Sequence, residues 1–140
     1  AWARGFSTFT NATISRVSGP NARDFTPFAH KNINWGMTYV RGAWSVRWNV
    51  AYAYKVTGTA GAASATIPAG TYSYVAPQIT QDGSFDYRLT RRLTLYGSAR
   101  NWNGANKRTE RAGPGTPEWT RPQVFQNFGT LVTFGVRSEF

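Results

Sequence analysis

The chain has 140 residues, about the length of one domain, and only 16% of them are charged where roughly 25% is typical. It has no cysteine, which excludes disulfides, thiolate nucleophiles and cysteine-ligated metals, and its single histidine, His30, cannot by itself form a metal site or a catalytic pair. The net charge of +10 makes nucleic acid or an anionic membrane surface the partner to consider.

The sequence contains no stretch that could form a membrane-spanning helix. The longest candidate, residues 44–56, is interrupted by Arg47, Asn49 and Lys55. The first residues, AWARGF, do not begin with Met and lack the pattern of a signal peptide. We therefore expect the chain to be a piece of a longer protein.

Residues in the first half alternate with the period of two that predicts β-strands. A first strand is expected over Phe6–Arg16, which is rich in Thr, Ile and Phe, and a second over Ile33–Tyr39. The clearest pattern runs over Trp44–Lys55, where one phase is apolar and the other mostly polar. The apolar phase holds Trp44, Val46, Trp48, Val50 and Tyr52, and the polar phase includes Arg47 and Asn49.

Three further strands are expected in the second half. Ile79–Leu89 places Phe85 and Tyr87 opposite Asp82 and Asp86, and Leu93–Arg100 alternates less strongly. The last strand is expected over Phe128–Phe140. Its apolar phase is Phe128, Val132, Phe134, Val136 and Phe140, and Arg137 lies on the other phase.

The expected connections between these strands alternate strictly between short and long. Arg41-Gly42 and Thr90–Arg92 are short enough for hairpins, whereas residues 17–31, 57–78 and 101–127 read as long loops. In an up-and-down meander, this order puts all tight turns at one end and all long loops at the other.

The combined pattern is typical of an outer-membrane β-barrel, whose outer face is apolar and aromatic and whose inner face is polar. We predict an all-β fold, an antiparallel up-and-down meander of about six strands that forms a segment of a transmembrane barrel. The expected lipid-facing residues are Trp35, Trp44, Val46, Trp48, Val50, Tyr52, Phe128 and Val132, and the expected lumen-facing residues are Arg47, Asn49, Asp86, Arg100 and Arg137. The alternative, a soluble antiparallel barrel or sandwich, would usually carry more Lys and Glu on its solvent face.

Six strands are too few to close a membrane barrel, which begins at about eight. Two open edges in hydrocarbon would leave backbone groups unpaired at several kcal/mol each. Either further strands precede residue 1, or several copies close one barrel, and the start without Met favours the first arrangement.

The segment Phe128–Phe140 resembles the last strand of TonB-dependent outer-membrane receptors, and Leu93–Asn103, with its Ala-Arg-Asn-apolar-polar ending, is similar to their penultimate strand. Phe9–Thr13 is similar to an Asn-containing strand earlier in the same barrels. The resemblance covers nearly all of the chain.

The resemblance implies that residues 1–140 are the last six strands of a barrel of about 22 strands. Such receptors lie in the bacterial outer membrane, import iron chelates, cobalamin or carbohydrates, enclose a plug and receive energy through TonB. Outer-membrane lipid, lipopolysaccharide, the remaining strands and the barrel-assembly machinery are then the expected partners. The terminal Phe140, with Phe134 and Val136, matches the barrel-assembly signal. The tight turns would face the periplasm.

A basic, aromatic segment lies in the last expected loop, where Lys107, Arg108 and Arg111 stand between Trp102 and Trp119. This segment has three possible interpretations. It is a solvated loop, an extracellular contact for lipopolysaccharide or an anionic ligand, or a site where the bases of a nucleic acid stack on the aromatic rings. The second function considered is accordingly a soluble basic β-domain that binds single-stranded nucleic acid through Trp and Arg. Under the receptor interpretation, no nucleic-acid partner and no cofactor are expected.

An enzymatic function is not expected. Asp82 and Asp86 would share a strand face at a spacing of about 13 Å, which exceeds the separation of a glycosidase pair.

Overall fold

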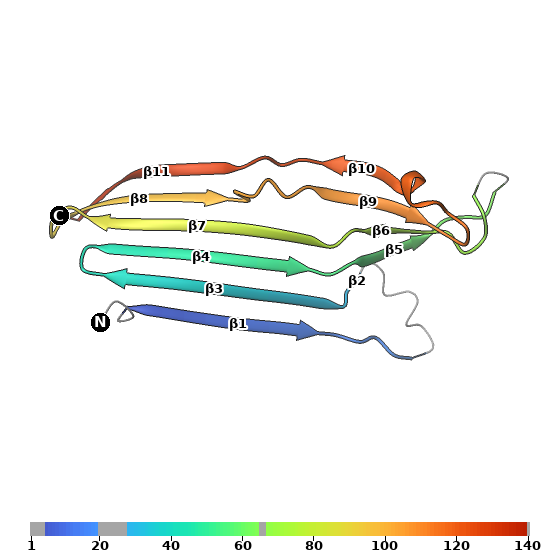
Figure 1. The fold of residues 1–140 in the computed structure, drawn as a ribbon, viewed down its shortest axis with the longest axis horizontal. Helices are drawn as coiled ribbons and strands as arrows, with labels where there is room; N and C mark the ends of the chain where they lie inside the picture. Colours follow the sequence, from blue (N-terminus) through green and yellow to red (C-terminus); the bar gives the residue numbers. More distant parts are fainter. Residues whose placement is uncertain (1–4, 20–27, 65–66, 140) are drawn as a thin grey trace.

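The computed structural model describes residues 5–19, 28–64 and 67–139, which form an elongated all-β structure of antiparallel sheets (Figure 1). Six long strands form the larger sheet. They are β1 (Phe6–Ile14), β3 (Lys31–Arg41), β4 (Trp44–Ala53), β7 (Gln78–Arg88), β8 (Leu93–Arg100) and β11 (Leu131–Ser138). Their spatial order, β1-β3-β4-β7-β8-β11, is their order along the chain. The predicted antiparallel meander of these six strands is therefore confirmed.

The register of the large sheet separates an apolar face from a polar face. Residues directly opposite each other on neighbouring strands point to the same face. One row across five strands is apolar and consists of Tyr39, Val46, Phe85, Gly97 and Phe134. The adjacent row, on the other face, consists of Thr38, Arg47, Ser84, Ser98 and Thr133. A slip of one residue would exchange the two faces, so this pattern fixes the register.

A second sheet continues the first at one end. Its members are β2 (Phe28–Ala29), β5 (Val56–Ala60), β6 (Tyr72–Val75), β9 (Lys107–Ala112) and β10 (Pro122–Gln126), and a short 3-10 helix, η2 (Glu118–Thr120), lies before β10. The order β10-β9-β6-β5-β2 repeats the order of the long strands to which they connect (Figure 1). The expectation of long loops without strands is thus wrong, because the connections pair with one another and extend the hairpins.

The tight turns gather at the end that also holds the start of β1 and the end of β11 (Figure 1). In the β3–β4 turn, Gly42 has φ +58°, a conformation that glycine adopts without strain. In the β7–β8 turn, the Thr90 hydroxyl accepts hydrogen bonds from the backbone N–H groups of Arg92 and Leu93. The opposite end carries the β5–β6 connection and the segment that follows β9.

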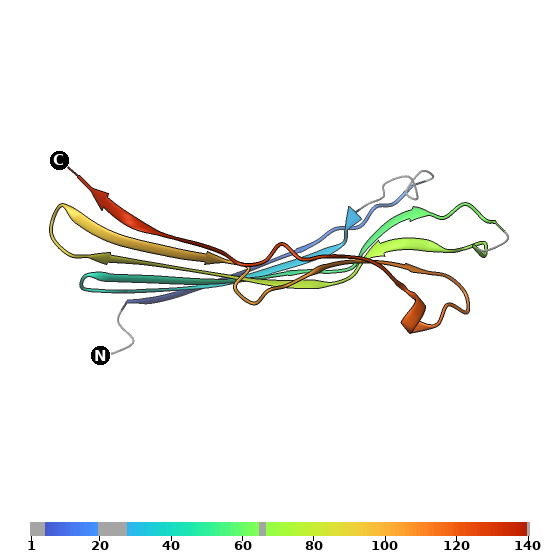
Figure 2. The same ribbon diagram turned by 90° about the horizontal axis from the view of Figure 1, so that it is seen from above.

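The sheets form a single twisted layer when seen edge-on (Figure 2). The accessible surface is 10443 Å², whereas a compact monomer of 15.5 kDa would expose about 7,200 Å². Among the described residues, the buried apolar side chains are those of Tyr74 and Ala76. Neither face of the large sheet therefore covers a hydrophobic core.

Five of the six long strands differ from the predicted bounds at one end or both, and only Leu93–Arg100 has the predicted bounds. β3 is two residues longer than predicted at each end, β4 ends two residues earlier than predicted, and β7 is shifted by one residue. β1 ends at Ile14, before Arg16, and the last strand begins at Leu131, after Phe128. The alternation through Phe128 is interrupted because the Asn127 side chain accepts a hydrogen bond from the Gly129 N–H at 2.8 Å and Gly129 has φ +65°. Phe140 lies outside the described residues.

Candidate functional site

The apolar face of the large sheet brings together most of the residues expected to face lipid. Trp44, Val46, Trp48, Val50 and Tyr52 pair with apolar-phase residues of β3 and β7, and Trp35 lies opposite Val50. Val132, Phe134 and Val136 continue the same face on β11. Phe128 is exposed but precedes β11, so it belongs to no row of the sheet. The exposed fraction is 49% for Trp44 and 82% for Phe134, so these large side chains have no covering layer.

Aromatic side chains gather where the apolar face meets the tight turns. The rings of Phe6 and Tyr39 are 4.6 Å apart, and those of Trp44 and Tyr87 are 4.3 Å apart. At the other end of this face, the Lys31 ammonium lies 5.3 Å from the centre of the Tyr54 ring. Amphipathic rings at both margins of an apolar band are the arrangement found at membrane–water interfaces.

A shallow apolar groove crosses β4, β7, β8 and β11. Its volume is about 630 Å³, and its walls include Trp48, Phe85, Trp102 and Phe134. The Trp48 indole N–H is buried there and has no hydrogen-bond partner, which an apolar environment explains. Trp35 packs edge-on against Trp48 with ring centres 5.4 Å apart. Trp102, expected in an outer loop, therefore lies on the apolar face of the sheet.

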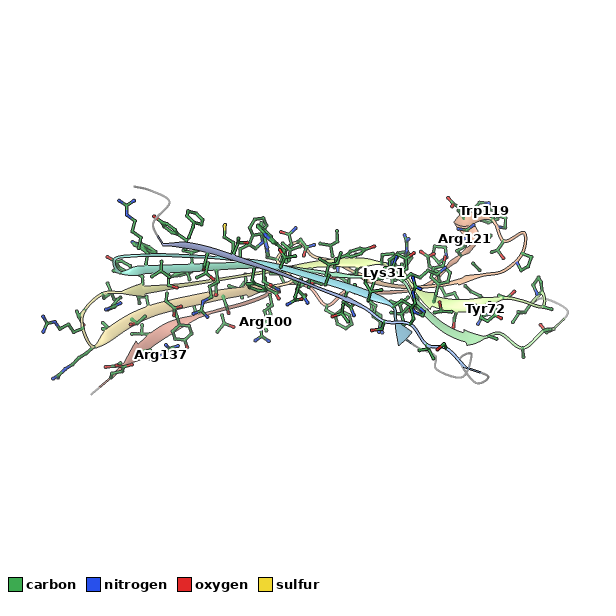
Figure 3. The ribbon with its side chains drawn as sticks, turned by 90° about the horizontal axis from the view of Figure 1, so that it is seen from below. Lys31, Tyr72, Arg100, Trp119, Arg121 and Arg137 are labelled. Carbon is green, nitrogen blue, oxygen red and sulfur yellow. The ribbon has the colours of Figure 1, made fainter. Side chains whose placement is uncertain are left out.

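The polar face carries all five residues expected to face a lumen. Arg47, Asn49 and Arg100 line one hollow of about 290 Å³ together with Asp82. Asp86 pairs with Ser45 and Tyr96 in the same phase, and Arg137 lies with its guanidinium 5.5 Å from the Tyr96 ring. Figure 3 shows Arg100 and Arg137 on one side of the ribbon. This face offers charged and hydrogen-bonding groups to water or to a polar ligand.

The junction between the two sheets is held by Asn101, for which the sequence alone predicts no structural role. Asn101 has φ +51°, and its side-chain amide donates to the carbonyl oxygens of Ala105 at 3.2 Å and Gly129 at 2.9 Å. Its side-chain oxygen accepts from the Ala105 N–H at 2.9 Å. Its backbone N–H donates to Asp82 at 2.9 Å. Asn101 thereby ties β7, β8 and the start of β11 together.

A second asparagine supports the same junction. Asn103 accepts a hydrogen bond from the Gln81 N–H at 3.1 Å and donates to the Ile79 carbonyl at 2.9 Å. Both bonds satisfy backbone groups of β7 that β8 does not pair with, because β8 has already ended at this point of the sheet. The Asn-Trp-Asn sequence therefore lets the chain cross from one sheet to the other without leaving backbone groups of β7 unpaired.

The three basic residues expected in the last loop lie in strand β9 and point to opposite faces of it. Lys107 and Arg111 lie in one phase of β9, while Arg108 lies in the other and forms an ion pair with Glu110. Trp119 stands apart in η2 with an exposed fraction of 83%, at the end of the molecule distant from Arg137 (Figure 3). The expected set does not form one continuous surface, because alternate residues of a strand point in opposite directions.

Glu110 instead forms a buried polar cluster with Tyr74. The Tyr74 hydroxyl donates a hydrogen bond to the Glu110 carboxylate, and the Lys55 ammonium lies 3.8 Å from the centre of the Tyr74 ring. Glu110 is only 6% exposed, so its pairing with Tyr74 and Arg108 offsets the cost of burying a carboxylate. Burial raises the pKa of the Tyr74 phenol above its ordinary value, and the bond to Glu110 raises this pKa further.

The described residues contain no group of three side chains suited to hold a metal ion, and they contain no helix long and apolar enough to cross a membrane. Comparison with protein-family models, with curated proteins and with solved structures found no match to this chain.

Proposed function

We propose that the chain is the C-terminal, six-strand portion of the barrel of a TonB-dependent receptor in a bacterial outer membrane. In this proposal, the apolar face contacts acyl chains, the polar face lines the lumen, and the β5–β6 and β9–β10 hairpins extend outside the cell. The whole receptor would import a scarce ligand such as an iron chelate, cobalamin or a carbohydrate. The chain has no enzymatic role in this account.

The observation that carries the proposal is the single sheet layer with one apolar and one polar face. Exposed apolar patches larger than about 600 Å² are rare on soluble monomers and mark contact with protein or membrane. Here exposed large apolar residues come from five of the six long strands, and on the sixth, β8, Leu93 and Leu95 are half-buried. A soluble sandwich would bury the same residues against a second layer.

The length of the strands supports a membrane location. β4 has 10 residues, which span about 33 Å at 3.3 Å per residue. At the usual barrel tilt of about 40°, this length crosses about 25 Å, the height of the apolar band in outer-membrane barrels. The ring pairs Phe6–Tyr39 and Trp44–Tyr87 would then lie at the periplasmic headgroups.

The two edges of the large sheet support the need for further strands. β1 and β11 each pair with a neighbour on one side only. Unpaired backbone groups in hydrocarbon cost several kcal/mol each, so a membrane location requires partners for both edges. The proposal supplies these partners as the remaining strands of the receptor, inserted by the barrel-assembly machinery.

The reading frame upstream of residue 1 tests the proposal directly. Several hundred codons of further amphipathic strands, preceded by a globular plug and a TonB-contacting segment, are expected. A start codon immediately before Ala1 would contradict the receptor assignment.

Uptake by cells that produce the protein tests the transport role. Radiolabelled ferric chelates, cobalamin and oligosaccharides are offered to these cells and to matched cells that lack TonB. We expect TonB-dependent accumulation of one ligand class. Equal accumulation of every ligand in both strains would reject the TonB-dependent role.

A further inference from the structure

Four arginines converge at the tight-turn end of the large sheet. Arg88 ends β7, Arg91 and Arg92 form the following turn, and Arg137 comes from β11. Together with Thr94 and Glu139 they line one polar hollow of about 240 Å³. None of these residues belongs to the groove or to the junction described above.

The register places two of these arginines on either side of one hydroxyl. Arg88 and Arg137 both pair directly with Thr94, so all three residues lie in one row on the polar face. Neighbouring strands are about 4.8 Å apart, which separates the Cα atoms of the two arginines by about 10 Å. An arginine side chain is long enough for both guanidinium groups to reach one anion held above Thr94.

The backbone around the other two arginines is fixed by hydrogen bonds. The Thr90 hydroxyl accepts from the Arg92 N–H at 3.2 Å, and the Arg92 carbonyl accepts from the Glu139 N–H at 3.0 Å. The Leu93 carbonyl accepts from the N–H groups of Leu89 and Thr90. The turn and the end of β11 are thus joined, and this reduces the ordering that a ligand would have to impose.

The charge of this hollow is not balanced by the described part of the chain. The ion pairs in the described residues join Arg108 to Glu110 and Arg121 to Glu118, and both pairs lie in the second sheet and its connections, away from the hollow. Glu139 lines the hollow but forms no ion pair with its arginines in the described structure. Four guanidinium groups beside one carboxylate repel one another, and this repulsion would be relieved by a bound anion.

We propose that this hollow is a binding site for a phosphate group. A phosphate monoester carries nearly two negative charges and three terminal oxygens, whereas a carboxylate carries one charge and two oxygens. Several arginine forks around one centre match the larger anion, and the Thr94 hydroxyl supplies a further donor. The site needs no membrane contact of the apolar face, so it goes beyond the proposed receptor role. The phosphate can come from a soluble ester or from a phospholipid headgroup at the membrane surface.

Calorimetric titration of the full chain in detergent micelles tests the site. The probes are inorganic phosphate, acetate and the short-chain lipid dihexanoyl phosphatidic acid. The variants are Arg88→Gln, Arg137→Gln and Arg137→Lys. Arg41→Gln is the matched control, because Arg41 ends β3 at the same end of the sheet but does not line the hollow. Far-ultraviolet circular dichroism checks that each variant keeps its β structure.

We expect phosphate to bind more tightly than acetate. Each Gln variant should weaken phosphate binding roughly ten- to hundredfold, the usual effect of losing one charged hydrogen bond, and Arg41→Gln should change it less than about twofold. Arg137→Lys retains the charge but not the planar fork, so it should give an intermediate loss even if a Gln variant fails to fold.

Inorganic phosphate and dihexanoyl phosphatidic acid, compared with each other, identify the source of the phosphate. Arginine-dependent binding of inorganic phosphate indicates a soluble ester, and such binding of the lipid alone indicates a headgroup. The absence of binding by every probe, equal binding of acetate, or an equal loss in Arg41→Gln would overturn the proposal.

Discussion

At the scale of single residues, glycines next to aromatic rings shape the surface of the sheet. Gly97 lies beneath the Phe85 ring on the apolar face, and Gly36 and Gly135 lie beneath Phe9 and Tyr96 on the polar face. A Cβ atom at any of the three would overlap the neighbouring ring. The glycines thus let aromatic side chains lie flat across adjacent strands, which compensates for the weak strand propensity of glycine.

Gly97→Ala should destabilise the sheet, because the new methyl group forces the Phe85 ring out of its position. We expect a loss of about 1–2 kcal/mol in the free energy of unfolding, measured by urea titration in lipid vesicles. Gly83→Ala is the matched control, since the nearest atom to its Cβ is the Arg47 carbonyl oxygen at 3.9 Å. An equal loss in both variants would show that the ring contact is unimportant.

Two substitutions of Asn101 should separate what its side-chain hydrogen bonds contribute to stability from what its backbone conformation contributes. Asn101→Gly keeps φ +51° accessible but removes three side-chain bonds, at about 1 kcal/mol each. Asn101→Ala should cost about 1 kcal/mol more, because alanine disfavours this φ. Unfolding titrations of the two variants measure both effects, and a more stable Ala variant would contradict the backbone argument.

Tyr74 should make stability depend on alkaline pH. Its pKa in the folded protein is raised, so the neutral phenol stabilises the fold at pH values below the unfolded pKa of about 10. This contribution should be lost as pH rises above about 10 through the folded pKa. Thermal unfolding followed from pH 8 to pH 12 should show a steeper loss in the natural chain than in Tyr74→Phe. Identical pH profiles would exclude this role.

At the scale of elements, the sequence predicted the strands that alternate and missed those that do not. β4 carries a large apolar residue at every second position, and β11 does so from Val132 to Val136. β9, with the sequence KRTERA, is polar up to its last residue, and β10 begins with Pro122. These short strands form because partners such as Ser73 and Arg111 lie in register across the hairpins. Such long-range pairing leaves little trace in local sequence.

The sequence also predicted part of the candidate site, namely which residues share a face of the large sheet. Period-two alternation was sufficient to assign the apolar and polar faces from Trp44 and Arg47 onward. The positions of Trp102 and Phe128 could not be predicted in this way, because each lies where a turn-like asparagine or glycine conformation interrupts the alternation. The tight-turn hollow could not be predicted in this way either, since Arg137 comes from a strand that is distant in the sequence from Arg88, Arg91 and Arg92.

The two faces of β4 should respond differently to a charge. Val50→Arg places a guanidinium near the middle of the apolar face and should lower stability by about 2–4 kcal/mol in lipid. Asn49→Arg, one residue away on the polar face, should change stability by less than about 1 kcal/mol. Urea titration of vesicle-inserted protein measures both, and equal losses would contradict the assignment of the faces.

At the scale of the whole molecule, the extended hairpins explain why the structure is elongated and why the large sheet covers no hydrophobic core. Five of the six long strands, all except β1, continue into the second sheet, with a change of conformation near His30, Lys55, Pro77, Asn101 and Asn127. The first sheet is amphipathic, while the second carries the buried Tyr74–Glu110 cluster. One continuous set of hairpins therefore combines an amphipathic sheet with an extension that holds a buried polar cluster.

The most direct test of the account is the environment of adjacent residues on β4. The chain has no native cysteine, so Val46→Cys and Arg47→Cys each accept a single nitroxide label. In outer-membrane vesicles from cells that produce the protein, collision with oxygen should dominate at position 46, and collision with a water-soluble nickel chelate should dominate at position 47. Equal access of the nickel chelate to both positions would contradict a lipid-facing apolar surface.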